Sequence, residues 1–272
     1  MQKFTEIKDE KVPSLGFGTF RLGGMDCLDG VADALDIGYR HIDTAQMYNN
    51  EEYVGEAIKN SAVDRDKIFI TTKVHPDNLS KEKFVPSVEK SLQKLALENV
   101  DLLLIHWPSD DETNRIAIDE LMHAQNKGYT RLIGVSNFTV SQLEKAKSQA
   151  DIFCDQVEYH PHLAQKKILK FLRENNMMLT SYSPLAVGRL LKDETIESLS
   201  EKYDHTPAQI ILRWHIQQEN VSAIPKASDH KHRKANFEIF DFELSSDDML
   251  LIHSLDQKKR YVDPSFGPEW DD

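Results

Sequence analysis

The chain has 272 residues, of which 40% are hydrophobic and 29% are charged, and this balance excludes a disordered or fibrous protein. Its formal net charge of −12 excludes nucleic acid and anionic membrane as main partners, because both would repel it. The two cysteines, Cys27 and Cys154, form no CxxC pair and no Cys/His ligand spacing, so neither a disulfide framework nor a structural zinc site is expected.

No segment of the sequence looks like an export or anchoring signal. Residues 1–12 hold no apolar stretch of signal-peptide length, and no run approaches the roughly 20 apolar residues of a membrane span. The sparse cysteines suit a reducing compartment. We therefore expect a cytoplasmic protein that acts as a monomer.

The predicted elements begin with a small β-hairpin over residues 4–12, around Lys8-Asp9-Glu10. Helical patterns then alternate with eight short apolar runs, the expected strands, at residues 15–17, 39–43, 68–73, 100–105, 131–135, 153–157, 178–182 and 222–224. A doubly wound sheet shares this alternation. Eight units in a chain close to the roughly 250 residues of a typical barrel favour a single domain, residues 1–272, folded as a (β/α)8 barrel.

Helix signals support the alternation. Apolar residues recur at helical spacing over residues 81–97, 115–127 and 166–175. Two capping boxes predict further helix starts, one formed by Thr139 and Gln142 and the other by Thr206 and Gln209, with Pro207 at the first helical position.

Titratable side chains follow three successive predicted strands. Asp43, Lys73 and His106 end the second, third and fourth apolar runs, and Tyr48 lies in the loop after Asp43. Each alone has an ordinary structural explanation, such as a loop cap, an exposed strand end or a core histidine. Because barrel enzymes place their chemistry at the carboxyl ends of the strands, we interpret the four together as a catalytic set.

This set suits proton donation by a phenol. A free tyrosine has a pKa near ~10, and an adjacent lysine cation should lower the pKa of Tyr48 while Asp43 keeps Lys73 charged. A neutral His106 could donate a hydrogen bond to a carbonyl oxygen that becomes negatively charged. No side chain can supply hydride, so a cofactor must.

The motifs around these residues resemble those of the aldo-keto reductase family over nearly the whole chain. In chain order they are LGFGTF at 15–20, GYRHIDTA at 38–45 followed by Tyr48, TTK at 71–73, HWP at 106–108, IGVSNF at 133–138 and SYSPL at 181–185. The resemblance implies metal-free, NAD(P)H-dependent reduction of aldehydes and ketones. It implies Tyr48 as general acid, with Asp43, Lys73 and His106 as its catalytic partners.

A dinucleotide fingerprint beginning at Gly16 fails, because Arg21 stands where its third glycine belongs. The resemblance instead implies that Ser136, Asn137 and Gln156 bind the nicotinamide carboxamide and that the Tyr182 ring stacks on the nicotinamide. Loop caps and a core tyrosine are the structural alternative. The remaining cofactor-binding positions implied by the resemblance are Gly18, Thr19, Phe20, Asp43, Ser183, Leu185, Lys226, Ala227, Ser228, His232, Arg233 and Asn236.

The densest basic stretch, Lys226 and then residues 230–234, suits a phosphate in an otherwise acidic chain, although a solvated basic turn would look the same. Relatives that prefer NADPH usually carry arginine where this chain has His232, and polar residues are common at Ala227 and Ala235. A neutral imidazole binds phosphate less well than a guanidinium. We therefore predict that Lys226, with Arg233, favours NADPH by a narrow margin, with NADH as a second cofactor.

Apolar side chains are expected to line the substrate mouth, although Met47 is equally suited to core packing. The expected substrate contacts are Phe20, Met47, Tyr48, His106, Trp107 and Trp270. Short segments at residues 108–114 and after residue 255 predict a slight roof and small polar substrates. Residues 190–194 and 268–271 carry a closer resemblance, which implies keto sugar acids such as 2,5-diketo-D-gluconate and dicarbonyls such as methylglyoxal.

Two other functions remain open from the sequence. Lys73 could form a Schiff base in an aldolase-type lyase, or the barrel could bind NADPH without catalysis and act as a redox sensor. Metal binding is not expected, because the His-x-His pairs at His160/His162 and His230/His232 lack further ligands.

Overall fold

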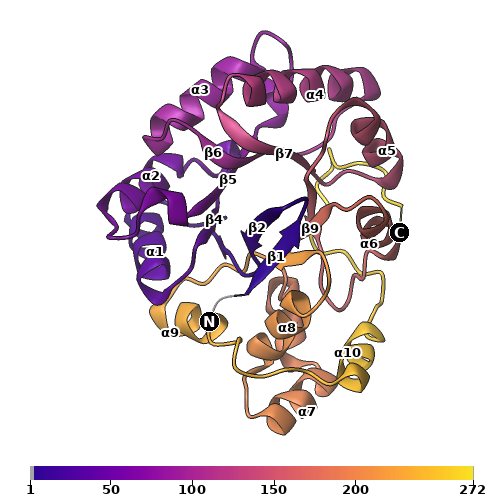
Figure 1. Cartoon of the computed structure of the whole chain (residues 1–272). Helices are drawn as coiled ribbons and strands as arrows, with labels where there is room; N and C mark the ends of the chain where they lie inside the picture. Colours follow the sequence, from indigo (N-terminus) through magenta and orange to yellow (C-terminus); the bar gives the residue numbers. More distant parts are fainter. Residues whose placement is uncertain (1–2, 272) are drawn as a thin grey trace.

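A computed structural model describes residues 3–271. Eight parallel strands follow one another in chain order around a ring (Figure 1). They are β3 (Phe17–Gly18), β4 (His41–Asp43), β5 (Phe69–Val74), β6 (Val100–Ile105), β7 (Thr130–Ser136), β8 (Cys154–Glu158), β9 (Met178–Tyr182) and β10 (Val221–Ala223). Leu15 pairs in parallel with Ala223, and the Gly16 N–H donates to the Ala223 carbonyl at 2.8 Å, so the first and last strands meet. The predicted (β/α)8 barrel is confirmed.

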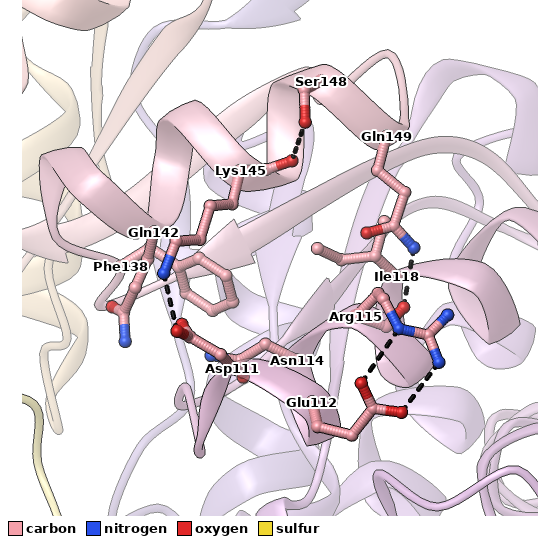
Figure 2. Close-up of a pocket in the computed structure, with 10 residues that line it drawn as sticks. All are labelled: Asp111, Glu112, Asn114, Arg115, Ile118, Phe138, Gln142, Lys145, Ser148 and Gln149. Carbon is pink, nitrogen blue, oxygen red and sulfur yellow. Dashed lines mark hydrogen bonds and ion pairs between the residues drawn. The ribbon is translucent and has the colours of Figure 1, made fainter.

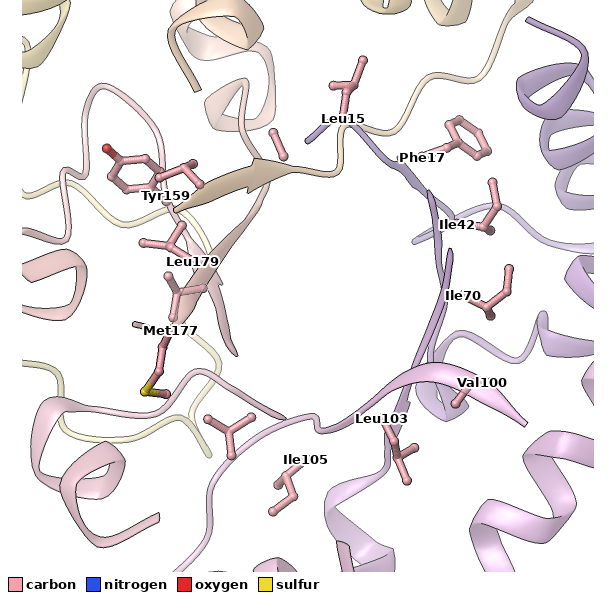
Figure 3. Close-up of a cluster of buried hydrophobic side chains, with 14 of the residues drawn as sticks. Leu15, Phe17, Ile42, Ile70, Val100, Leu103, Ile105, Tyr159, Met177 and Leu179 are labelled. Atoms are coloured by element: carbon pink, nitrogen blue, oxygen red, sulfur yellow. The ribbon is translucent and has the colours of Figure 1, made fainter. Parts of the chain in front are cut away.

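Side chains along each strand alternate between the barrel interior and the helical layer. In β6, Leu103 and Ile105 belong to the large apolar cluster that includes helix residues, whereas Leu102 and Leu104 belong to a second cluster. Figure 3 shows Leu103 and Ile105 pointing away from the ring, with Ile42 and Ile70 from neighbouring strands. Because both faces are buried there, residues 102–105 of β6 are a continuous apolar run in the sequence.

Helices between the strands form the outer layer (Figure 1). The α-helices are α1 (Gly24–Ile37), α2 (Glu51–Asn60), α3 (Phe84–Leu95), α4 (Asp111–Asn126), α5 (Val140–Gln149), α6 (Lys166–Glu174), α7 (Glu194–Tyr203), α8 (Pro207–Ile216), α9 (His230–Phe237) and α10 (Ser246–His253). The 3-10 helices are η1 (Gln46–Tyr48), η2 (Arg65–Lys67), η3 (Pro76–Asn78) and η4 (Ala186–Lys192).

Local capping fixes where the helices begin. Both predicted capping boxes are present, at the starts of α5 and α8. Helix α4 begins four residues before the predicted Arg115, because the Asp110 side chain accepts hydrogen bonds from the Glu112 and Thr113 N–H groups. Helix α3 is shorter than predicted and ends before Ala96, whose φ of 52° is left-handed.

The N-terminal hairpin closes one end of the barrel. Strands β1 (Phe4–Ile7) and β2 (Glu10–Pro13) pair antiparallel, and Lys8 and Asp9 turn the chain with φ angles of 50° and 65°. Ile7 and Val12 pack against side chains that start the barrel strands, among them Phe69, Cys154 and Met178. This apolar plug fills the amino-terminal end of the strands and leaves the polar strand ends at the opposite mouth.

Candidate active site

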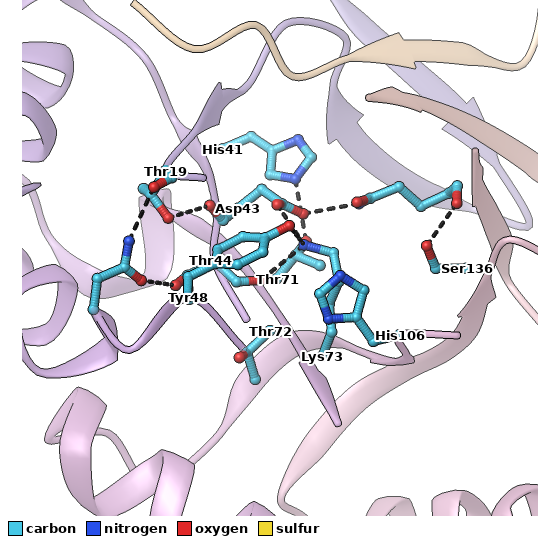
Figure 4. Close-up of polar contacts among 12 residues, drawn as sticks. Thr19, His41, Asp43, Thr44, Tyr48, Thr71, Thr72, Lys73, His106 and Ser136 are labelled. Atoms are coloured by element: carbon cyan, nitrogen blue, oxygen red, sulfur yellow. Dashed lines mark hydrogen bonds and ion pairs between the residues drawn. The ribbon is translucent and has the colours of Figure 1, made fainter. Parts of the chain in front are cut away.

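The four catalytic candidates meet at the carboxyl ends of β4, β5 and β6. Asp43 ends β4, Lys73 is the last residue but one of β5, and His106 directly follows β6. Tyr48 ends the short helix η1 in the loop after β4. Figure 4 shows the side chains of the four directed toward one another.

The Lys73 ammonium lies at the centre of this group. Its Nζ is 2.5 Å from Asp43 Oδ1, 2.8 Å from the Thr44 carbonyl oxygen and 3.3 Å from the Tyr48 hydroxyl. An ammonium has three N–H donors, and here three acceptors surround it. The lysine side chain is fully buried, so this geometry fits a charged lysine paired with Asp43 and held against the phenol.

Burial sets the protonation states of the group. It lowers the pKa of Lys73, an effect that Asp43 opposes, and it raises the pKa of Tyr48 well above 10, an effect that Asp43 strengthens. The sequence led us to expect a lowered pKa for Tyr48 beside Lys73, whereas burial and the Asp43 carboxylate raise it. The phenol keeps its proton at neutral pH and is available to donate it.

His106 is a neutral imidazole beside the phenol. Burial and the Lys73 charge hold its pKa well below 6.5. Its ring packs edge-on against Tyr48, with centroids 5.5 Å apart, and its Nδ1 is buried without a hydrogen-bond partner. A neutral imidazole at this place can donate one hydrogen bond to a ligand oxygen.

The loop that carries Tyr48 is fixed by Gln46, a residue that the sequence analysis missed. Its Nε2 donates to Ser87 Oγ and Ser91 Oγ, both at 3.1 Å, and its Oε1 accepts from the His75 N–H at 2.9 Å. These bonds join η1 to α3 and to the end of β5. A polar residue two positions before the phenol was the only sequence signal.

The residues assigned to the nicotinamide lie beside the catalytic group. Gln156 Nε2 donates to Asp43 Oδ2 at 2.8 Å, and Ser136 Oγ donates to the Gln156 carbonyl at 2.7 Å. Asn137, with a left-handed φ of 64°, donates from Nδ2 to Ser136 Oγ and to the His106 carbonyl, both at 3.1 Å. The Tyr182 hydroxyl donates to Asn137 Oδ1 at 2.7 Å. Two amides, a hydroxyl and a half-buried ring match the donors, acceptors and flat face of a nicotinamide carboxamide.

The loops after β3 and β10 lie side by side. The Gly18 N–H donates to the Pro225 carbonyl at 3.0 Å, and an added Cβ at Gly18 would lie 2.7 Å from the Ile224 carbonyl oxygen. Thr19 Oγ1 donates to the Asp43 carbonyl at 2.9 Å. Gly18 and Thr19 thus join the β10 loop, which carries Lys226, to the catalytic strand ends.

The structure corrects the expected phosphate site at Arg233. Its Nε donates to Asp33 Oδ2 at 2.5 Å and its Nη1 donates to the Ala227 carbonyl at 3.2 Å, and the residue is only 7% exposed. It therefore ties α9 to α1 instead of facing solvent. The other basic residues of this stretch are exposed, among them Lys226, which donates to Ser228 Oγ, and His232, which is paired with Asp229.

The expected substrate contacts gather around the mouth. Phe20 is 53% exposed, with its ring 5.1 Å from the Tyr48 ring, and Met47 is partly buried beside Tyr48. Trp107 packs against Trp270 with centroids 6.2 Å apart. Phe266, which no sequence pattern indicated, also belongs to this group, because its ring lies 5.4 Å from that of Trp107.

The C-terminal segment, residues 256–271, carries Phe266 and Trp270, which form an aromatic wall with Trp107. Hydrogen bonds hold this segment at several points. Glu158, fully buried at the end of β8, accepts from the Tyr261 and Val262 N–H groups at 2.8 and 2.9 Å. Near the end of the segment, Asp271 accepts from the Val140 N–H at 2.5 Å. These contacts fix the segment in place against the mouth.

Two hollows on the described surface lie away from this group. The larger, about 440 Å³, lies between α4 and α5, where Lys145 pairs with Asp111 and Arg115 with Glu112 (Figure 2). The other, about 230 Å³, is beside the N-terminal hairpin. Neither hollow is lined by Asp43, Lys73 or His106.

The two histidines of the His160/His162 pair are hydrogen-bonded to protein side chains. His160 Nε2 bonds Glu158, and His162 Nδ1 bonds the Tyr261 hydroxyl. Within residues 3–271 no three His, Cys, Asp or Glu side chains are grouped to hold a metal ion, and Cys27 and Cys154 are buried free thiols. In the same range no helix is long and apolar enough to cross a membrane.

Known proteins with similar sequences share this architecture. The chain is 41% identical over 268 residues to the methylglyoxal reductase DkgB of Escherichia coli O157:H7, covering 96% of this chain and 99% of that protein. It is 40% identical over 255 residues to the glyoxal reductase of Bacillus subtilis, covering 92% and 91%. The crystal structure of a candidate 2,5-diketo-D-gluconic acid reductase B matches it with a TM-score of 0.97 at 41% identity, covering 100% of this chain and 98% of that one. The model of the aldo/keto reductase family matches residues 14–257, and the chain belongs to that family.

Proposed function

We propose that the protein reduces small aldehydes and ketones to alcohols with NADPH, and that Tyr48 supplies the proton. The observation that carries this proposal is the buried Lys73 ammonium, which joins Asp43 to the Tyr48 hydroxyl beside the neutral His106. The names of the relatives, methylglyoxal reductase and glyoxal reductase, support a reaction at a carbonyl group.

The reduced nicotinamide supplies hydride to the carbonyl carbon when it is bound. The chain's own residues act on the oxygen. His106 orients the carbonyl by hydrogen bonding and stabilises the negative charge that grows on the oxygen. Tyr48 then transfers its hydroxyl proton to that oxygen, and the resulting phenolate is stabilised by Lys73 Nζ, 3.3 Å away. Asp43 keeps the lysine protonated in its buried position.

Ser136, Asn137 and Gln156 would hold the carboxamide, with the Tyr182 ring against the nicotinamide face. Lys226 is an exposed cation that supports NADPH, whereas the Arg233 guanidinium is bound to Asp33. Because His232 stands in this loop instead of an arginine, we expect a narrow preference over NADH.

The environment of Lys73 does not favour the lyase. A Schiff base forms from a neutral amine, whereas Asp43 at 2.5 Å holds the nitrogen as an ammonium. No described feature favours the sensor, because the proton donor and its partners are all in contact.

A substrate and cofactor panel tests the proposal. Oxidation of NADPH and NADH is followed with methylglyoxal, simple aldehydes and 2,5-diketo-D-gluconate, for the wild type and for Tyr48→Phe. We expect NADPH-dependent turnover that Tyr48→Phe lowers by roughly 10²- to 10⁴-fold, with cofactor binding nearly unchanged. Turnover that survives without the hydroxyl would refute the proton assignment, and binding of NADPH without any turnover would favour the sensor.

A further inference from the structure

A buried carboxylate lies behind the catalytic lysine, on the helical side of β5. Glu51 is the first residue of α2 and is only 1% exposed. Its Oε1 accepts a hydrogen bond from Thr72 Oγ1 at 2.7 Å, and Thr72 directly precedes Lys73 on β5. Neither the proposed reaction nor the expected nicotinamide site uses this carboxylate.

The alternation of side chains along β5 sets these neighbours on opposite faces of the strand. Val74 belongs to the apolar cluster that includes helix residues, so Thr72, two positions earlier, faces the same layer. Lys73 faces the barrel interior, where it contacts Asp43. Figure 4 shows Thr72 apart from the side chains that surround the Lys73 nitrogen. Strand β5 therefore has a carboxylate against each face, Asp43 in the interior and Glu51 in the helical layer.

Close packing fixes Glu51 in this place. The preceding residue, Asn50, is fully buried, and its Nδ2 donates to two backbone carbonyl oxygens of the loop after β3, at 3.0 and 2.8 Å. One turn further along α2, Gly55 lies so close to α3 that an added Cβ would be 2.3 Å from the Leu95 carbonyl oxygen. Because residues 51 and 55 share one helical face, Glu51 is held between α3 and β5.

The Glu51 carboxylate is only loosely paired with a cation in contact. Lys94 Nζ on α3 lies 3.9 Å from its Oε2, which is too far for a hydrogen bond. Cys27 on α1 is uncharged, because burial raises the pKa of its thiol to about 12. Burial raises the pKa of Glu51, and the charges of Lys94 and Lys73 are among the influences that oppose this rise. The lysine of β5 is therefore within electrostatic reach of Glu51.

The same interaction acts on the lysine. Burial lowers the pKa of Lys73, and both Asp43 and, more weakly, Glu51 oppose that change. The other titratable groups that face the ammonium are uncharged at neutral pH, because burial raises the pKa of the phenol and the thiol and lowers that of the imidazole; they are Tyr48, Cys154 and His106. Asp43 and Glu51 are thus the carboxylates that act on the ammonium.

We infer that Glu51 is a positioning residue for proton donation, a second negative counter-charge that keeps Lys73 protonated from the helical side of β5. It acts through Lys73 and touches neither substrate nor cofactor. Charges buried in a protein are weakly screened, so a carboxylate need not touch the ammonium to stabilise it. The inference deepens the proposed reductase function and rests on it, because the charged lysine stabilises the Tyr48 phenolate.

Two substitutions in the first turn of α2 test the inference. Glu51→Gln removes the buried charge but keeps an oxygen for Thr72, and Glu52→Gln removes a neighbouring charge that is exposed. We expect Glu51→Gln to move the alkaline fall of kcat/KM to lower pH by roughly 0.5–1 pH unit, through kcat and not KM. Near pH 6.5, where Lys73 is charged in both variants, activity should change less than about twofold. Glu52→Gln should leave the profile in place.

Three further variants separate the charge from the local structure. Thr72→Val removes the hydrogen bond but keeps both charges, and Glu51→Asp keeps the negative charge, so both should retain the wild-type alkaline fall. Lys94→Gln removes the cation on the other side of Glu51 and should move the fall to higher pH, which tests the inference even where Glu51→Gln does not fold. The inference is overturned if Glu51→Gln lowers kcat/KM equally at every pH, if its profile coincides with that of Glu52→Gln, or if Lys94→Gln does not raise the pH of the fall.

Urea unfolding at different pH values gives a readout that needs no turnover. Because burial lowers the pKa of Lys73, the unfolded chain binds a proton that the folded chain lacks in the alkaline range below about pH 10, and this makes the free energy of unfolding rise with pH. Glu51→Gln should start this rise at lower pH, and it should have no such effect in a Lys73→Met background. If no carbonyl is reduced but this coupling is present, the reductase proposal fails and the counter-charge stands. If turnover is present but Glu51→Gln shifts neither profile, the inference fails and the reductase proposal stands.

Discussion

Replacing Asp43 with asparagine would break the buried charge pair at the centre of the site. Both carboxylate oxygens are used: Oδ1 accepts from Lys73 Nζ at 2.5 Å and Oδ2 accepts from Gln156 Nε2 at 2.8 Å. An amide has one acceptor oxygen and one NH2 donor, so in either orientation one of these partners faces another donor. In either orientation the ammonium also loses its counter-charge.

The expected cost follows from burial. The Lys73 and Asp43 side chains are 0% and 2% exposed, and removing one partner of such a pair costs about 3–5 kcal/mol. Asp119→Asn is the matched control, because Asp119 pairs with Arg115 where both side chains are about half exposed, and such pairs contribute roughly 0–1 kcal/mol. Without Asp43 the pKa of Lys73 also falls further, so activity should be lost at lower pH than in the wild type.

Urea unfolding and a pH–rate profile measure the two effects. Asp43→Asn should lower the free energy of unfolding by about 3–5 kcal/mol and move the alkaline fall in kcat/KM to lower pH, while Asp119→Asn changes neither appreciably. If Asp43→Asn is as stable as Asp119→Asn and its profile is unshifted, Lys73 is not a buried ammonium held by Asp43.

Three further outcomes follow from the protonation states and the cofactor loop. First, the wild-type rate should fall as pH rises, because Lys73, with its pKa lowered by burial, loses its proton while Tyr48, with its pKa raised, keeps its own. A rate that stays constant to pH 10 contradicts this order. Second, burial lowers the pKa of His41 and His215 to about 4, so between pH 6.5 and 4 the unfolded chain binds protons that the folded chain does not. The free energy of unfolding should therefore decrease as the pH is lowered from 6.5 to 4, by about 3 kcal/mol for each histidine. His215→Gln should flatten that slope in urea unfolding, and an unchanged slope would argue against a buried neutral imidazole. Third, His232→Arg should tighten NADPH more than NADH in fluorescence titrations, and equal changes for the two cofactors would place their phosphate elsewhere.

The barrel was predictable because its signals are local. The run over residues 102–105 is apolar on both faces, and the capping boxes at Thr139 and Thr206 mark helix starts without any tertiary information. Strand ends were less certain, since Leu15 and Ala223 close the barrel through a contact between distant parts of the chain. The catalytic candidates were predictable from their places at strand ends, which become neighbours in a parallel barrel.

The sequence could not show which neighbour dominates the pKa of a buried group or which partner a charged side chain binds. The direction of the Tyr48 pKa shift depends on burial and on Asp43 as well as on Lys73, and their balance is set by distances. Arg233 looked like a phosphate ligand because its partner, Asp33, is 200 positions away on α1.

The central claim is that Lys73 and Tyr48 act as one proton-donating unit. A double-mutant cycle on kcat/KM with Lys73→Met, Tyr48→Phe and the combined variant measures this coupling directly, with cofactor binding checked for each protein. We expect the combined variant to lose no more activity than the more damaged single variant, because each change disables the same step. If the two losses multiply instead, the lysine and the phenol act independently and the claim is contradicted.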